Sequence, residues 1–301
     1  MVNSAQPESR AKPLPKPPWI KVRIGQGPGY SRVARILRET RLHTVCEEAL
    51  CPNKGQCWEH GRATILILGD ACTRSCGFCH VSSRRPLPRD ADEPTRVAKA
   101  VKATGLTDVV ITSVTRDDLP DGGAAHWAET VRRVHETAPG ILVEVLVPDF
   151  GGSRESLQNV IEAKPDVLGH NLETVPSLYA TVRPEADYER SLAVLWQSSR
   201  SGMITKTALM VGLGEPENEV VAVMRDARKA GCEIIFIGQY LQPTSGHLPV
   251  VRYVEPAEFD AYRRKGLEMG FGVVVSAPLV RSSYHADEQD AYVRQRLNNR
   301  S

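Results

Sequence analysis

The chain has 301 residues, of which 41% are hydrophobic and 25% charged, and this composition is typical of a globular protein with a substantial core. The formal net charge of +2 disfavours a dedicated nucleic-acid-binding protein, which usually carries a much larger basic excess. No apolar run is long enough to cross a bilayer and the first residues do not resemble a secretory signal, so we expect a cytoplasmic protein without nucleic-acid or membrane partners.

Residues 1–29 are rich in Pro, Lys and Gly and show no amphipathic period, so we expect an extended arm there. The helical spacing of Val33, Ile36 and Leu37 then predicts a short helix over 30–41.

Beyond residue 63, short β-branched runs alternate with amphipathic stretches. The runs lie at 63–69, 108–114, 141–148, 166–173, 204–214 and 233–242, and helices are expected at 93–104, 124–138, 153–163 and 217–230. A further helix over 256–270 and a strand over 271–277 complete the series. This alternation indicates a parallel sheet with right-handed crossovers, and both an open six-unit barrel and a doubly wound sheet fit it.

No change of composition marks a linker inside this series. We therefore treat 63–277 as one domain, preceded by an N-terminal extension over 1–62 and followed by a C-terminal tail over 278–301.

Cys72, Cys76 and Cys79 form a C-x3-C-x2-C group directly after the first β-run. A loop at the carboxyl end of a strand is where barrels and open α/β sheets place their chemistry. Three thiolates this close can hold one iron–sulfur cluster and leave one iron open to a small molecule. Zinc is the alternative, because His80 could complete a Cys3His site.

A second group, Cys46, Cys51 and Cys57, has the spacing C-x4-C-x5-C, which fits neither zinc fingers nor the common ferredoxin runs. Six of the seven cysteines thus lie in two groups of three, each one ligand short of four. Cys232 stands alone at the start of a β-run and is expected to be a small buried core residue.

The cysteine segments CTRSCGFC and CEEALCPNKGQCW resemble those of the radical S-adenosylmethionine enzymes and, within them, the lipoyl synthase family. The resemblance extends through SVTRDDLPDGGA, EVLVPDFGG, GHNLETVPSLYATVRP, TKTALMVGLGE, GQYLQPT and RSSYHA. These segments run from about residue 30 to residue 286, and their common order makes the match specific.

The resemblance implies a partial (β/α)6 TIM-type barrel with two [4Fe–4S] clusters at its mouth. The cluster on Cys72, Cys76 and Cys79 would cleave S-adenosylmethionine to a 5′-deoxyadenosyl radical, which abstracts hydrogen from C6 and then C8 of a protein-bound octanoyl chain. An auxiliary cluster on the other three cysteines would give up the sulfur. Its fourth ligand would be the serine of RSSY that maps to Ser283 rather than to Ser282.

The same resemblance implies several protein partners. The substrates would be octanoylated carriers, namely the lipoyl domains of 2-oxoacid dehydrogenase E2 subunits and the glycine cleavage H protein. A ferredoxin or flavodoxin would supply electrons, and a carrier protein would rebuild the auxiliary cluster.

Polar residues at the ends of the β-runs are candidates for contact with S-adenosylmethionine or the substrate. Asn171 and Glu173 lie at the end of the fourth run, where barrel strands deliver side chains to the active site. Ser113 lies at the end of the second run and Arg116 just beyond it, and both would hold the methionine group or its carboxylate. The alternative for Arg116 is a structural ion pair with one of the two aspartates that follow it.

Gly212 and Gly214 lie at the end of the fifth run and would let the backbone approach the adenosine closely, although a simple turn explains them almost as well. Arg281 would either orient the cluster ligand or fix the tail, and His170 is expected to be structural rather than catalytic.

Three rival functions fit less well. A sulfur-inserting enzyme of the biotin synthase type would lack the upstream cysteines and RSSY, and a two-cluster electron carrier rarely needs a six-unit α/β scaffold. A zinc-stabilised nucleic-acid-binding module would need a basic patch with interleaved aromatic residues, whereas only 6% of this chain is aromatic.

Overall fold

The structure is a computed structural model that describes residues 14–22, 25, 27–282 and 287–299. Its main sheet contains β1 (His43–Thr44), β2 (Thr64–Ile67), β5 (Asp108–Ser113), β6 (Leu142–Leu146), β7 (Val167–Gly169), β8 (Ile204–Val211), β9 (Ile234–Gln239) and β10 (Val273–Ser276). The strands lie in that order across the sheet. All neighbours are parallel except β1, which pairs antiparallel with β2.

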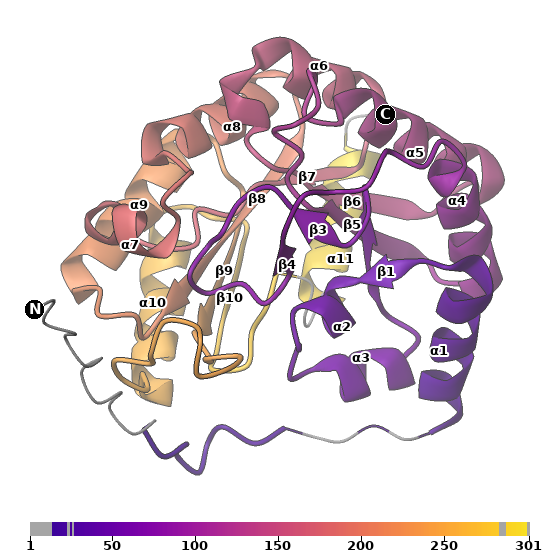
Figure 1. Cartoon of the computed structure of the whole chain (residues 1–301). Coiled ribbons are helices and arrows are strands. Elements are labelled where there is room, and N and C mark those ends of the chain that lie inside the picture. Colours follow the sequence, from indigo (N-terminus) through magenta and orange to yellow (C-terminus); the bar gives the residue numbers. More distant parts are fainter. Residues whose placement is uncertain (1–13, 23–24, 26, 283–286, 300–301) are drawn as a thin grey trace, which may run out of the picture.

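This strand order decides between the two architectures that the sequence leaves open. In a doubly wound sheet the order reverses at a switch point, whereas here each strand pairs with the next one along the chain. The helices of the six units cover the outside of the sheet (Figure 1) and are α4 (Glu93–Thr104), α5 (Ala124–Thr137), α6 (Arg154–Glu162), α8 (Tyr188–Arg200), α9 (Glu217–Lys229) and α10 (Pro256–Glu268). The fold is therefore the expected partial barrel.

The predicted helices agree closely with the observed ones because their apolar faces are continuous. In α9, Val220, Val223, Met224 and Ala227 are buried against the strands. Helix α8 lies in a stretch for which no helix is predicted, although Asp187 caps it by accepting a hydrogen bond from the Arg190 N–H at 2.7 Å.

The N-terminal extension packs directly on the barrel. It contains α1 (Pro28–Thr40), β1, α2 (Val45–Glu48) and α3 (Lys54–Glu59). Val33, Ile36 and Trp58 share one hydrophobic cluster with barrel residues such as Ile67 and Val97. The second cysteine group is thereby seated against the first strands of the sheet.

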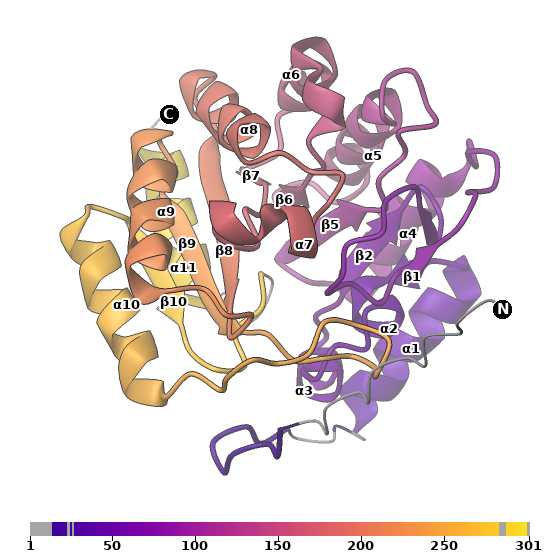
Figure 2. The same cartoon turned by 60° about the vertical axis from the view of Figure 1, so that its left-hand side comes forward.

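The remaining elements lie at the two ends of the barrel. At the mouth are β3 (Ala71–Cys72), β4 (Ser82–Ser83), the 3-10 turns Phe150–Gly152 and Pro176–Leu178, and α7 (Tyr179–Val182). The tail forms a helix that was not predicted, α11 (Asp287–Asn298), behind the strands in Figure 1. Figure 2 shows the segment between β9 and α10 running across the mouth towards α2 and α3. None of the helices within the described ranges is long and apolar enough to cross a membrane.

Candidate active site

The loop that carries Cys72, Cys76 and Cys79 lies at the carboxyl end of the strands, between β2 and α4. Segments that follow three other strands hold this loop through hydrogen bonds. These run from Thr73 N to Thr115 O (3.0 Å), from Ser75 Oγ to Glu185 Oε1 (2.7 Å), from Gly77 N to Val182 O (2.9 Å) and from Leu248 N to Gly77 O (3.0 Å). The positions of the three cysteines are thus set by the barrel rather than by the loop alone.

Arg74, between the first two cysteines of this loop, ties it to two further segments. Its buried guanidinium donates from Nε to Asp117 Oδ2 at 2.8 Å and from Nη2 to Asp149 Oδ1 at 2.7 Å. Burial opposes both charges, but these bonds raise the pKa of Arg74 and lower that of Asp149 to about 2. Arg190 also contacts Asp149, so α8 joins the same network.

The chemistry of this loop fits a soft, positively charged group. Burial raises the pKa of the Cys76 thiol to about 11 and that of the Cys79 thiol to about 12. Cys72 Sγ accepts hydrogen bonds from the N–H groups of Arg74 and Thr115, each at 3.4 Å. Thiols in such a site are protonated without metal and lose their protons when they coordinate iron.

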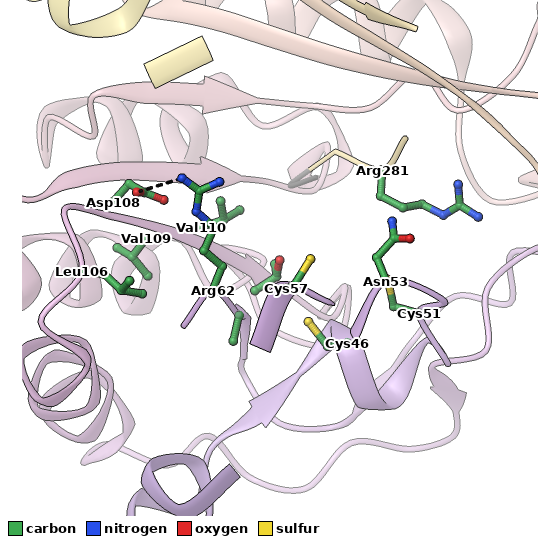
Figure 3. Close-up of a pocket in the computed structure, with 12 residues that line it drawn as sticks. Cys46, Cys51, Asn53, Cys57, Arg62, Leu106, Asp108, Val109, Val110 and Arg281 are labelled. Carbon is green, nitrogen blue, oxygen red and sulfur yellow. Dashed lines mark ion pairs between the residues drawn. The ribbon is translucent and has the colours of Figure 1, made fainter. Parts of the chain in front are cut away.

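The second cysteine group surrounds a pocket beside β2 and β5 (Figure 3). Cys46 lies in α2, Cys51 in the turn that follows and Cys57 in α3, and all three line the pocket together with Arg281. Burial is the largest cause that raises the pKa of Cys46 to about 11 and that of Cys57 to about 12. Negative charge on Cys51 would raise both pKa values further, and all three cysteines line this one pocket.

The zinc alternative would require His80 as a fourth ligand beside the three thiols. Within the described residues, no three His, Cys, Asp or Glu side chains converge on a position for a single metal ion. A zinc ion needs its ligand atoms about 2.0–2.3 Å from one point, whereas a cluster presents its irons at separate corners. His80, the possible fourth ligand, directs Nδ1 at the carbonyl oxygen of Glu48 at 2.8 Å.

Glu173 and Arg281 lie between the two thiol groups. The Glu173 carboxyl is partly buried, and this desolvation raises its pKa, while the charge of Arg183, the hydrogen bond from Asn171 and the charge of Arg281 lower it. The same carboxylate raises the pKa of Cys76 and Cys79, and Arg281 is within electrostatic reach of Cys51. The hydrogen bond from His80, next to Cys79, to the Glu48 carbonyl, between Cys46 and Cys51, places the two cysteine segments side by side.

Three strand ends at this mouth carry buried polar atoms without a hydrogen-bond partner among the described residues. They are Ser113 Oγ at the end of β5, Asn171 Oδ1 after β7 and Ser276 Oγ at the end of β10. The amide of Asn171 also donates to Glu173 Oε1 at 3.0 Å. Unpaired buried polar atoms are costly, so their grouping at the barrel mouth fits a polar ligand. Ser276 is a residue that sequence reasoning missed.

Arg116 and the two glycines have structural roles. Arg116 donates from Nε and Nη2 to Asp118, both at 2.8 Å, and from Nη1 to Leu68 O at 3.2 Å, which is the structural alternative stated above. Gly212 has φ +102°, and a Cβ there would lie 2.1 Å from Gln239 Nε2. Gly214 also has a positive φ, so a tight turn accounts for both glycines.

The RSSY serine, Ser283, lies outside the described residues, but the chain leading to it is held at the second cysteine pocket. Asn53, which is buried between Cys51 and Cys57, donates from Nδ2 to Leu279 O at 2.7 Å. Arg281, two residues further along, lines the same pocket (Figure 3). The turn-forming composition around Asn53 predicts a bend, but nothing in it points to this contact across 226 residues.

Arg183 is a second residue to which sequence reasoning gave no role. It donates from Nη1 to Asn171 O at 2.9 Å and lies over the Tyr179 ring at 5.5 Å. Its charge lowers the pKa of Cys76 and of His170, so it contributes positive potential beside the first cysteine loop. The sequence signal for Arg183 is its position after the fourth β-run, because segments that follow barrel strands line the active site.

Comparison with known proteins agrees with this geometry. Residues 66–227 match the sequence model of the radical SAM superfamily, and residues 3–51 match that of the N-terminal domain of lipoyl synthase. The solved structure of methylornithine synthase covers 89% of this chain and 88% of its own, with a TM-score of 0.53 at 15% identity. Streptococcus suis SuiB covers 74% and 53%, with a TM-score of 0.54 at 11% identity. These two likenesses concern the fold alone.

Sequence relatives are much closer. The lipoyl synthase of Rubrobacter xylanophilus is 55% identical over 91% of this chain and 86% of its own length. That of Chlorobium phaeovibrioides is 53% identical over 92% and 98%, and that of Thermus thermophilus is 52% identical over 93% and 89%. The chain belongs to the lipoyl synthase family of radical S-adenosylmethionine enzymes.

Proposed function

We propose that this enzyme inserts two sulfur atoms, at C6 and C8, into an octanoyl chain that is amide-linked to a lysine of a carrier protein. The observation that carries the proposal is that two charged residues that interact with each other reach one cysteine group each: Glu173 acts on Cys76 and Cys79, and Arg281 acts on Cys51. An octanoyl chain in the mouth would then lie beside a radical source and a sulfur source at once.

Cys72, Cys76 and Cys79 would hold one [4Fe–4S] cluster, and Cys46, Cys51 and Cys57, with Ser283, would hold the auxiliary cluster. When bound, the first cluster would supply the electron that cleaves S-adenosylmethionine and the second would supply sulfur. A serine oxygen is a harder ligand than a thiolate and a poorer partner for cluster iron, so its release during sulfur donation is easier.

The chain's own residues would position the reactants and keep water out. Ser113, Asn171 and Ser276 offer unpaired buried polar atoms to S-adenosylmethionine or to the substrate. Glu173 would accept hydrogen bonds from the same ligand. The N–H groups of Arg74 and Thr115 that contact Cys72 Sγ would stabilise the charge on that thiolate.

Three classes of protein would serve this reaction. The octanoyl chain would be presented by lipoyl domains of 2-oxoacid dehydrogenase E2 subunits and by the glycine cleavage H protein. A ferredoxin or flavodoxin would reduce the first cluster. Because each product consumes two sulfur atoms, a carrier protein would have to rebuild the auxiliary cluster after turnover.

The test is anaerobic reconstitution followed by analysis of iron, sulfide and product with an octanoyl-lysine peptide, S-adenosylmethionine and dithionite. We expect about eight irons per chain, as two four-iron clusters require, and a lipoyl peptide. Eight irons and 5′-deoxyadenosine without sulfur in the peptide would contradict the substrate assignment, and zinc without iron or sulfide would contradict the whole proposal.

Single cysteine variants separate the roles of the two groups. Cys72→Ala should abolish S-adenosylmethionine cleavage, whereas Cys51→Ala should retain cleavage and lose sulfur insertion. Cys232→Ala is the matched control, because this fully buried thiol lies in the hydrophobic core and donates to the Thr205 and Ile234 carbonyl oxygens there. Lipoyl product from Cys51→Ala would disprove the sacrificial role of the auxiliary cluster.

A further inference from the structure

His80 contacts both cysteine segments, although it is a ligand of neither cluster in the function proposed above. The residue directly follows Cys79, and its Nδ1 lies 2.8 Å from the carbonyl oxygen of Glu48, between Cys46 and Cys51 in the other group. A carbonyl oxygen can only accept, so Nδ1 carries the hydrogen and donates it. One side chain thus joins the two segments directly.

The His80 ring is itself held in place from the other side. Its centroid lies 5.6 Å from that of His247, with 33° between the ring planes. His247 donates from Nε2 to Cys79 O at 3.1 Å, and its Nδ1 lies 2.9 Å from Thr244 Oγ1. The segment between β9 and α10, which crosses the mouth in Figure 2 and carries His247, therefore packs on the ring with which His80 reaches Glu48.

We propose that His80 is a positioning residue that sets the separation and relative orientation of the two cluster-binding segments. The carbonyl that it holds belongs to the last residue of α2, and the next turn carries N–H bonds from Ala49 to Val45 O and from Cys51 to Cys46 O. Fixing this carbonyl therefore fixes the turn that orients the thiols of Cys46 and Cys51.

This inference rests on the proposed function, because the separation matters only if one substrate meets both groups. A displacement of about 1 Å between reacting centres can slow a reaction by about a hundredfold. A hydrogen bond between the two segments would hold that separation while the substrate changes from one reactive carbon to the other.

The first measurement is amide hydrogen–deuterium exchange of the full chain, with and without clusters. Because His80→Ala removes one hydrogen bond, exchange over 46–51 should become about fivefold faster, while β9 should be unchanged. His80→Phe retains the ring but has no donor and should behave like His80→Ala. His80→Asn retains a donor close to the position of Nδ1 and should restore slow exchange.

His135→Ala is the matched control, because this exposed histidine also contacts a backbone carbonyl, Lys164 O at 3.2 Å, but on the distant helix α5. It should leave exchange over 46–51 unchanged. Equal exchange over 46–51 in the unaltered chain, His80→Ala and His80→Phe would overturn the positioning role, as would failure of His80→Asn to restore protection.

The second measurement is the number of sulfur atoms inserted per S-adenosylmethionine cleaved. This ratio should fall at least about fivefold in His80→Ala and His80→Phe and recover in His80→Asn, because looser positioning lets the radical be lost before it reacts. An unchanged ratio would overturn the inference. If the unaltered chain inserts no sulfur but His80→Ala still speeds exchange, the proposed function fails and the structural role of His80 stands.

Discussion

Glu173 combines two features that cost free energy at a single residue. Its φ of +65° lies in the left-handed region, which is unfavourable for a residue with a Cβ by about 1–2 kcal/mol. Its carboxyl is partly buried, and this desolvation raises its pKa. The backbone is held by a short parallel bridge to Leu209, with the Glu173 N–H donating to Ala208 O at 3.0 Å. Strain of this kind concentrates at functional sites, which agrees with a role in ligand binding.

His170, three residues before Glu173, predicts how stability depends on pH. Burial, followed by the charge of Arg183, lowers its pKa from 6.5 to about 4, and Nδ1 donates to Val147 O at 2.8 Å. Below pH 6.5 His170 binds a proton in the unfolded chain, whereas in the folded chain it stays neutral until the pH approaches 4. The free energy of unfolding should therefore fall by about 2 kcal/mol between pH 6.5 and pH 5, from this residue alone.

Urea unfolding of the apo chain at pH 7 and pH 5 checks this effect. His170→Asn keeps a donor for Val147 O but does not titrate, so its loss of stability on acidification should be smaller by about 2 kcal/mol. His135→Asn, on the exposed face of α5, should retain the full loss. The prediction is wrong if His170→Asn and the unaltered chain lose equal stability.

At the scale of elements, α11 closes the end of the barrel opposite the cysteine loop. Lys206 Nζ on β8 lies 2.8 Å from Glu144 Oε1 on β6, and both side chains are buried. Gln289 of α11 completes this pair, because it accepts from Lys206 Nζ and donates to Glu144 Oε2, each at 2.5 Å. Since α11 directly follows the RSSY segment, this contact anchors one end of that segment and the Asn53–Leu279 bond anchors the other.

Replacing Gln289 should release α11 from the barrel. Gln289→Leu leaves buried charged atoms short of a partner, and we expect the free energy of unfolding to fall by about 2 kcal/mol. Gln295→Leu, on the exposed side of the same helix, is the matched control and should change stability by less than about 0.5 kcal/mol. The measurement is the urea concentration at the midpoint of unfolding for each variant. Similar midpoints for Gln289→Leu and Gln295→Leu would show that Gln289 does not anchor α11.

At the scale of the molecule, local patterns predicted the elements but not how distant segments meet. Alternating β-branched and amphipathic stretches place the seven parallel strands of the barrel and all of its outer helices except α8, because each buried face repeats within a few residues. The order of strands across the sheet has no local signal in the sequence. An open barrel and a doubly wound sheet therefore both agree with the pattern, and only the observed strand order distinguishes them. The two cysteine groups were visible from their spacing, whereas the contacts of Asn53 and Gln289 join residues far apart and leave no periodic trace.

These distant contacts lead to a prediction about the whole chain. The second cysteine pocket is lined by the N-terminal segment, by β5 and by Arg281 near the C-terminus, so occupation of the pocket would join all three. A ligand that binds only the folded chain stabilises it by about 3 kcal/mol at a hundred times its Kd. Loading both clusters should therefore raise the Tm by about 5 °C or more.

Cys51→Ala and Cys72→Ala should each retain only part of this rise in Tm, because each variant still holds one complete cysteine group. The control is Cys232→Ala, whose thiol lies in the core, and it should show the full rise above its own apo value. Calorimetry of loaded and apo chains under anaerobic conditions gives the comparison. Equal Tm values for the loaded and apo forms of the unaltered chain would contradict the prediction and would show that the clusters do not stabilise the fold.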